Sequence, residues 1–422
     1  MRKLFRKLWN DERGNALIIA GAALPLVIGS AGLASDTVQW TLWKRQLQRA
    51  ADSSALAGVY AKVQNNAGQT AAQAVSADLL DNNHTNITLL GGYPEVTYPT
   101  GSGWMNGVKV KLALQKELGF SSVFMSSPPI ITAEATAATI ATGVYCVVSL
   151  EETSATGITA TGNGTIDLGC GMITNSTSIS AAIATGSSEV YATPIAAVGN
   201  VADSDHWNGA ELLPFTVKQE DPFADVDPPT VSPCPGAANR IRNNPNTTID
   251  RSADTGVVCV SEIDAGGTVN LGSATYVIDG GDFSVGAQGR VSCNGCTIIL
   301  SNSSSSSTAT IGDVDINAGA QINMSAPTSG TYEDILFYQD RRAPSSSSTV
   351  NKINGNSSST FTGAMYFPKQ QLQVNGNAGL NFSCAQFVAR RVEFSGNGTI
   401  TNTCPGGYGN GSIMGKHVRL VA

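Results

Sequence analysis

The first pattern along the chain is an uninterrupted apolar run, Ala16 to Ala34, which reads ALIIAGAALPLVIGSAGLA and carries no charged residue. As a helix this run is about 28 Å long, close to the thickness of the hydrocarbon core of a bilayer. Only two acidic residues precede the run, against five basic ones: Arg2, Lys3, Arg6, Lys7 and Arg13. This asymmetry favours a cytoplasmic N-terminus. The pattern predicts one uncleaved membrane span, with a cleaved signal peptide and a buried soluble helix as the open alternatives.

A helical pattern continues beyond the span, from Asp36 to about Leu80. Small and apolar residues recur there at the spacing of one helix face: Leu47, Ala51, Ala55 and Val59. We expect this helix to extend the span as a stalk, and we expect that face to contact other proteins. Trp40 and Trp43 lie where tryptophan favours a membrane–water interface, although core packing explains them equally well.

Alternation with a period of two follows the stalk. Residues 108–114 read VKVKLAL and residues 131–137 read ITAEATA, each typical of a half-buried strand. The two stretches predict a small antiparallel sheet that closes the region 36–145.

From about residue 146 a turn rich in Gly and Asn recurs before alternating apolar stretches, at residues 162–166, 286–291, 318–322, 376–380 and 396–400. The last two copies are 20 residues apart, near the length of one coil of a parallel β-helix. We therefore expect an α+β membrane-anchored protein: a tail and transmembrane helix over 1–35, the stalk and sheet over 36–145, and a β-rich, parallel β-helix-like region over 146–422. A β-sandwich stays open because the period is irregular. Seven prolines between residues 214 and 250 predict an extended loop or linker there.

Charge and cysteine content bear on the partners of the chain and on its cellular compartment. The net charge is −7 and no basic cluster follows residue 13, which argues against a nucleic-acid partner. Eight cysteines all follow the span: Cys146, Cys170, Cys234, Cys259, Cys293, Cys296, Cys384 and Cys404. An even number on the exported side predicts disulfides, whose pairing the sequence leaves open. Cys293 and Cys296 have the spacing of zinc ligands, but without a second pair or nearby histidines a disulfide or free thiols are favoured.

Two groups of carboxylates are the candidate chemistry. Asp313 and Asp315 would share one face of a strand, with Asp279 and Asp282 near them in sequence. Paired carboxylates can hydrolyse sugar chains, although a solvated strand edge is the ordinary reading. A second group could offer oxygen ligands to calcium, although a charged linker explains it as well: Asp221, Asp225 and Asp227. No catalytic motif keeps its required spacing, so we expect no enzyme, no metal and no cofactor.

The N-terminal third carries a recognisable combination of residues. Arg13-Gly14-Asn15 leads into the apolar run, Asp36 follows it, and residues 47–59 read LQRAADSSALAGV before the strand pair. This combination resembles the TadE/TadG-like family of Tad (tight adherence) pilus-assembly proteins over residues 1 to about 145. Residues 334–343 and 361–372 resemble the exported region of some TadG-like proteins more weakly.

The resemblance sets further expectations. Prepilin-like members are cut after a glycine and carry glutamate at the fifth mature position; a cut after Gly14 would put Ile19 there. With no von Willebrand A motif DxSxS either, the chain resembles the TadG-like branch that keeps its anchor, rather than a filament subunit. This implies a non-enzymatic, envelope-anchored component of Tad/Flp-type pilus assembly, acting in anchoring or adherence beside other pilus-assembly proteins. It implies a single pass through the bacterial inner membrane, with the C-terminal region periplasmic or surface-reaching. The alternative is an anchored β-helix that binds or cleaves cell-wall or surface polysaccharide.

Overall fold

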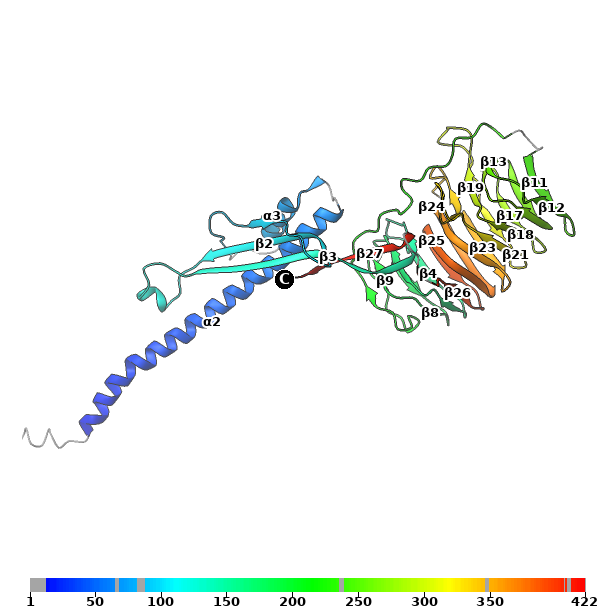
Figure 1. Cartoon of the computed structure of the whole chain (residues 1–422). Helices are drawn as coiled ribbons and strands as arrows, with labels where there is room; N and C mark the ends of the chain where they lie inside the picture. The colour runs from blue at the N-terminus through cyan, green and yellow to red at the C-terminus, as the bar shows by residue number, and fades with distance from the viewer. Residues whose placement is uncertain are drawn as a thin grey trace, which may run out of the picture. The chain divides into compact units, whose positions relative to one another are not determined.

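The computed structural model describes residues 13–64, 68–81, 88–234, 239–345, 349–405, 407 and 411–421, with side chains from residue 18 onward. The basic residues Arg2, Lys3, Arg6 and Lys7 lie outside the described residues. The chain divides into two compact units, unit 1 over residues 1–140 with 418–422 and unit 2 over residues 141–417. Two strands, β3 (Ile130–Ser149) and β27 (Ile413–Leu420), run from one unit into the other (Figure 1).

Unit 1 is built on one long helix. Helix α2 (Arg13–Gln64) is continuous for 52 residues and joins the apolar run to the stalk, as the sequence predicts. The prediction that this helix reaches Leu80 is wrong, because a second helix, α3 (Ala71–Asp81), begins after a break. Gly68 has a φ of 70°, and Thr70 and Gln73 bond each other's backbone N–H as a capping box. These two signals let the chain reverse and lay α3 against α2.

A small sheet completes unit 1. β1 (Glu95–Thr97), β2 (Met105–Gln115) and β3 pair antiparallel, with Val110 opposite Ala135 and Leu112 opposite Ala133. A short 3₁₀ helix, η3 (Ser121–Val123), lies in the β2–β3 connection. The helix and sheet approach closely at Gly58, where a Cβ would stand 2.9 Å from the Val108 side chain.

Unit 2 consists of strands that pair in parallel in three rows, which we call stacks A, B and C. Stack A contains β13 (Gly256–Val260), β16 (Ala274–Asp279), β19 (Thr297–Ser301), β22 (Ile335–Gln339), the middles of β24 (Thr360–Ala378) and β25 (Leu380–Ser395), the end of β3, β6 (Gly171–Thr174), β9 (Ile195–Ala197) and β10 (Leu212–Leu213).

Stacks B and C have the same order. Stack B contains β11 (Arg240–Asn243), β14 (Glu262–Ala265), β17 (Phe283–Val285), β20 (Val314–Ile316), β23 (Val350–Asn356), the C-terminal parts of β24 and β25, β4 (Ile158–Ala160) and β7 (Ala182–Ala184). Stack C contains β12 (Thr248–Arg251), β15 (Thr268–Leu271), β18 (Arg290–Asn294), β21 (Gln321–Ser325), the N-terminal parts of β24 and β25, β26 (Ile400–Thr403), β5 (Thr165–Asp167) and β8 (Glu189–Tyr191).

The order of strands in space differs from their order in the chain. Residues 145–213 form the last rows of each stack, and residues 240–403 return to them, so that β25 and β26 pair with β3, β4 and β5. The connecting residues 214–234, which we call the strap, lie between these two segments in sequence.

The strap covers one face of stack A. Four strands of stack A, β6, β9, β19 and β22, are buried at every position, whereas β17, β20 and β21 alternate buried and more exposed positions. The outer face of stack A carries Tyr338 and Tyr366, against which Phe223 and Val226 of the strap pack. The sequence predicts a loop or linker over 214–250, but β11 and the start of β12 lie inside that range, and the strap packs against a buried cluster of unit 2.

Candidate functional site

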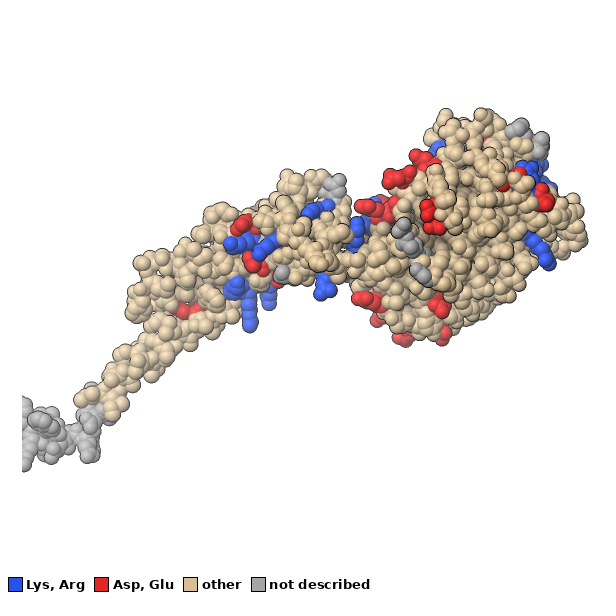
Figure 2. All heavy atoms as spheres, in the orientation of Figure 1, with Lys and Arg blue, Asp and Glu red and all other residues tan. Residues whose placement is uncertain are grey.

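The N-terminal part of α2 presents an apolar surface. Its large side chains are 56–75% exposed and belong to Ile18, Ile19, Leu24, Leu26, Val27, Ile28 and Leu33. No charged residue interrupts this surface, as the space-filling view shows (Figure 2). Among the described residues this is the single helix long and apolar enough to cross a membrane, and it fits a single-pass anchor.

The stalk face proposed for partner contact is buried inside unit 1. Leu47, Ala51, Ala55 and Val59 are all 0% exposed. Helix α3 and strand β2 contact this stretch of α2 and cover it. The prediction that these four residues touch other proteins is therefore wrong, because their spacing reflects the core of unit 1. Of the two tryptophans, Trp40 is 41% exposed, while the ammonium of Lys116 lies 5.1 Å from the ring centre of Trp43.

Asp36 joins α2 to the β2–β3 connection. Its carboxylate accepts hydrogen bonds from the backbone N–H of Phe120 and from the backbone N–H and hydroxyl of Ser121. These bonds, the one from Phe120 first, hold the pKa of Asp36 below its ordinary value. One turn earlier, a Cβ on Gly32 would stand 2.3 Å from the Phe120 ring, so any larger residue there would displace that ring. Sequence reasoning missed this role, although a lone carboxylate directly after an apolar run was the visible signal.

All eight cysteines are paired in the structure: Cys146–Cys170, Cys234–Cys259, Cys293–Cys296 and Cys384–Cys404. Three of the pairs are separated by 20–25 residues. That separation matches the distance in sequence between neighbouring strands of one stack, such as β5 and β8. Cysteine spacing read against the turn repeat was therefore the signal that could have suggested the pairing.

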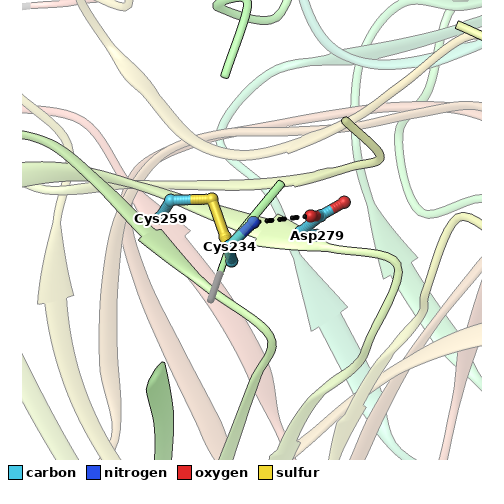
Figure 3. A group of neighbouring side chains, drawn as sticks. All are labelled: Cys234, Cys259 and Asp279. Carbon is cyan, nitrogen blue, oxygen red and sulfur yellow. Dashed lines mark hydrogen bonds between the residues drawn. A yellow bond between two sulfur atoms is a disulfide. The ribbon is translucent and has the colours of Figure 1, made fainter. Parts of the chain in front are cut away.

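Cys234, Cys259 and Asp279 form a cluster at the end of the strap (Figure 3). Asp279 accepts hydrogen bonds from the N–H of Cys234 at 3.1 Å and from the N–H of Ser303 at 2.7 Å. Metals are bound by thiolates, and sulfur atoms joined in a disulfide are not thiolates. The arrangement therefore fastens the strap to stack A and offers no zinc site.

Three of the four candidate carboxylates meet on the outer side of stack B. Asp282, Asp313 and Asp315 line a groove of about 480 Å³ with Lys352, whereas Asp279 lies at the strap. The N–H of Asp313 donates to the Asp282 carboxylate at 2.9 Å. Burial, and next the charge of Asp282, raise the pKa of Asp313 to about 6.

Two acidic residues of the strap bind residues of stack A and of the loop that follows β22. Asp221 accepts a hydrogen bond from the Tyr366 hydroxyl at 2.6 Å, and Asp227 pairs with Arg341 at 2.9 Å. Arg341 also donates to the carbonyls of Phe223, Ala224 and Val226. Asp225 is exposed. Two of the three carboxylates weighed as possible calcium ligands thus hold the strap in place.

Comparison with known proteins gives one match. The model of a family described as "Putative Flp pilus-assembly TadE/G-like" matches residues 14–75. No curated protein and no solved structure matches the chain. The matched range covers nearly all of α2 and the start of α3, and so includes the apolar anchor, Asp36 and the buried stalk face. Over residues 14–75 the chain is therefore similar to the TadE/G-like Flp pilus-assembly family.

Proposed function

We propose that this protein is a non-enzymatic, membrane-anchored component of Tad/Flp pilus assembly that acts in anchoring or adherence. The observation that carries the proposal is the family match over residues 14–75, because it falls on the anchor and on the helix that organises unit 1. A role beside other pilus-assembly proteins follows from that family. With Leu47, Ala51, Ala55 and Val59 buried, the contacts to those proteins lie on other surfaces of the chain.

The proposal includes a topology. The anchor crosses the bacterial inner membrane once, with the basic N-terminus in the cytoplasm. Unit 2 then lies in the periplasm or reaches toward the cell surface, an oxidising compartment in which four disulfides persist. A net charge of −7 supports a partner other than nucleic acid.

We also propose that stacks A, B and C close around one core as a parallel β-helix. Strands three apart in the chain pair in parallel, as in β14–β17–β20 and β15–β18–β21. Side chains from all three stacks share one buried cluster, including Phe283 from stack B, Phe337 from stack A and Phe361 from stack C. An irregular period is expected here because loops of different length, such as residues 302–313, join the stacks.

The proposal is tested by deleting the gene in its source bacterium and counting surface pili and adherent cells. We expect the deletion to lose adherence and the full chain to restore it. A version in which residues 1–35 are replaced by a cleavable signal peptide should fail to restore it at the same protein level. A version with an unrelated transmembrane helix is the matched control for anchoring. Normal pili and adherence in the deletion strain would show that the proposal is wrong.

A second candidate is an anchored protein that binds or cleaves surface polysaccharide. The groove of Asp282, Asp313 and Asp315 favours it, because one carboxyl with a pKa of about 6 beside a second carboxylate is the pattern of a general acid and its partner. The buried Oδ1 of Asp313 has no hydrogen-bond partner among the described residues.

One double variant separates the two candidates. We expect Asp313→Asn with Asp315→Asn to leave adherence unchanged, since the proposed function does not use the groove. Loss of adherence at a normal protein level, or release of reducing sugar ends that the variant abolishes, would favour the polysaccharide function instead.

A further inference from the structure

The connection between β2 and β3 exposes an apolar patch on unit 1. Val123 is 75% exposed, Phe124 74%, Met125 46% and Ile130 55%. No charged residue occurs between Glu117 and Glu134. We call residues 120–130 the tip loop. A contiguous exposed apolar patch of this kind marks a binding surface more often than chance exposure does.

The tip loop is fixed at one level of α2. Asp36 binds the backbone of Phe120 and Ser121, and the Phe120 ring fills the space above Gly32. Gly32 belongs to the apolar run, and Asp36 is the first charged residue after it. The patch therefore continues the lipid-facing surface of the anchor, and Figure 1 shows the loop beside α2.

The depth of this level can be judged from Trp40. Trp40 is 41% exposed and lies eight residues after Gly32, which is about 12 Å along a helix axis. Exposed tryptophan beside a span favours the headgroup region. Side chains held about 12 Å closer to the bilayer centre would reach the headgroup–acyl boundary, the depth at which interfacial elements bury their apolar faces.

We propose that the tip loop inserts Val123, Phe124 and Met125 into the headgroup–acyl boundary of the bilayer that α2 crosses. The leaflet is the one that faces the rest of unit 1. This inference rests on the membrane anchoring proposed above. Lipid is the occupant that the position favours, because the patch lies at the end of the lipid-facing run and carries no charge. Two contacts with one bilayer restrict the tilt and rotation of α2 and so give unit 1 a fixed orientation on the membrane.

An introduced cysteine can be labelled selectively, because every described cysteine is in a disulfide. A cysteine introduced at Phe124 is spin-labelled in the full chain and reconstituted into phosphatidylcholine–phosphatidylglycerol vesicles at high lipid excess. Labels at Val27→Cys in the span and Tyr98→Cys on unit 1 serve as lipid and water references; these side chains are 63% and 51% exposed. Collision with oxygen and with a water-soluble nickel complex reports the surroundings of each label.

We expect the oxygen-to-nickel collision ratio at Phe124 to exceed that at Tyr98 and to fall below that at Val27. A Phe124 label as accessible to nickel as the Tyr98 label would overturn the inference. A Phe124 label shielded from both reagents would also overturn it, since that result indicates a protein contact. Water-like values at Val27 would instead show that the anchoring itself is wrong.

A second variant tests the positioning by Asp36. Asp36→Ala removes the acceptors for Phe120 and Ser121, so we expect the Phe124 label to shift toward water while the Val27 label stays unchanged. An unchanged Phe124 label in this variant would show that Asp36 does not hold the tip loop at the membrane.

Discussion

Two carboxylates show how neighbours decide the role of one residue type. Asp36 is 4% exposed, yet donors from Phe120 and Ser121 stabilise its charge and lower its pKa. Asp313 lies in a groove beside Asp282, and its pKa rises to about 6. The sequence singled out both residues, Asp36 after the apolar run and Asp313 among the paired carboxylates. It could not predict the opposite shifts, because the donors and the second carboxylate come from segments 31 to 85 residues away.

The raised pKa of Asp313 has a measurable consequence for stability. Between pH 4 and pH 6 the folded state binds this proton more readily than the unfolded state does, so stability falls as pH rises through that window. Asp313→Asn removes the charge, and it should raise the free energy of unfolding at pH 7 by at most about 3 kcal/mol and flatten its pH dependence. Chemical denaturation of the full chain in detergent between pH 4 and pH 7.5 measures this. Asp315→Asn, at an exposed position on the same face, should change little, and an unchanged Asp313→Asn protein at pH 7 would contradict the expectation.

At the scale of elements, periodicity predicted which helices and strands exist better than it predicted what packs against them. The alternating stretches 108–114 and 131–137 are the paired strands β2 and β3. All five repeated turns precede strands of stack C, namely β5, β18, β21, β25 and β26. The helical face at Leu47 was equally visible, but a pattern does not say whether a chain's own sheet or another protein covers it. The break near Gly68 escaped notice because no proline marks it.

The buried face of α2 gives a matched pair of variants. Ala55 is 0% exposed in the core of unit 1, whereas Ala72 is exposed on α3. A carboxylate at Ala55 would be buried without a partner, so Ala55→Asp should cost several kcal/mol. We expect lower protein level, faster proteolysis of unit 1 and, in consequence, reduced adherence. Ala72→Asp should leave all three unchanged. Reduced adherence of Ala55→Asp at normal level and normal protease resistance would indicate a partner surface after all.

At the scale of the molecule, two identical turns show what sequence cannot supply. GNGTI occurs at residues 162–166 and 396–400, 234 positions apart. The structure stacks the two copies: Ile400 pairs with Ile166, and the Asn163 amide donates to the Asn397 side chain at 3.0 Å. Gly162 has a φ of 99°, and a Cβ there would stand 2.3 Å from the Gly396 carbonyl. The repeat was visible, but which copies touch depends on the strap, whose course is set by contacts with Arg341 and Tyr366 far along the chain.

This arrangement predicts that unit 2 survives a cut at the end of its strap. Residues 141–234 and 239–417 are joined by the pairings of β25 and β26 with β3, β4 and β5, by the strap contacts and by Cys234–Cys259. A protease site replacing residues 235–238, which lie outside the described residues, should therefore give two fragments that co-elute after cleavage under native conditions. They should co-elute even after reduction, with the circular dichroism of the uncut variant, because long parallel pairings and a shared core outweigh one disulfide. The uncut variant is the control for the inserted sequence. Separation of the fragments after reduction would show that the disulfide, rather than the stacking of residues 145–213 on residues 380–403, holds the unit together.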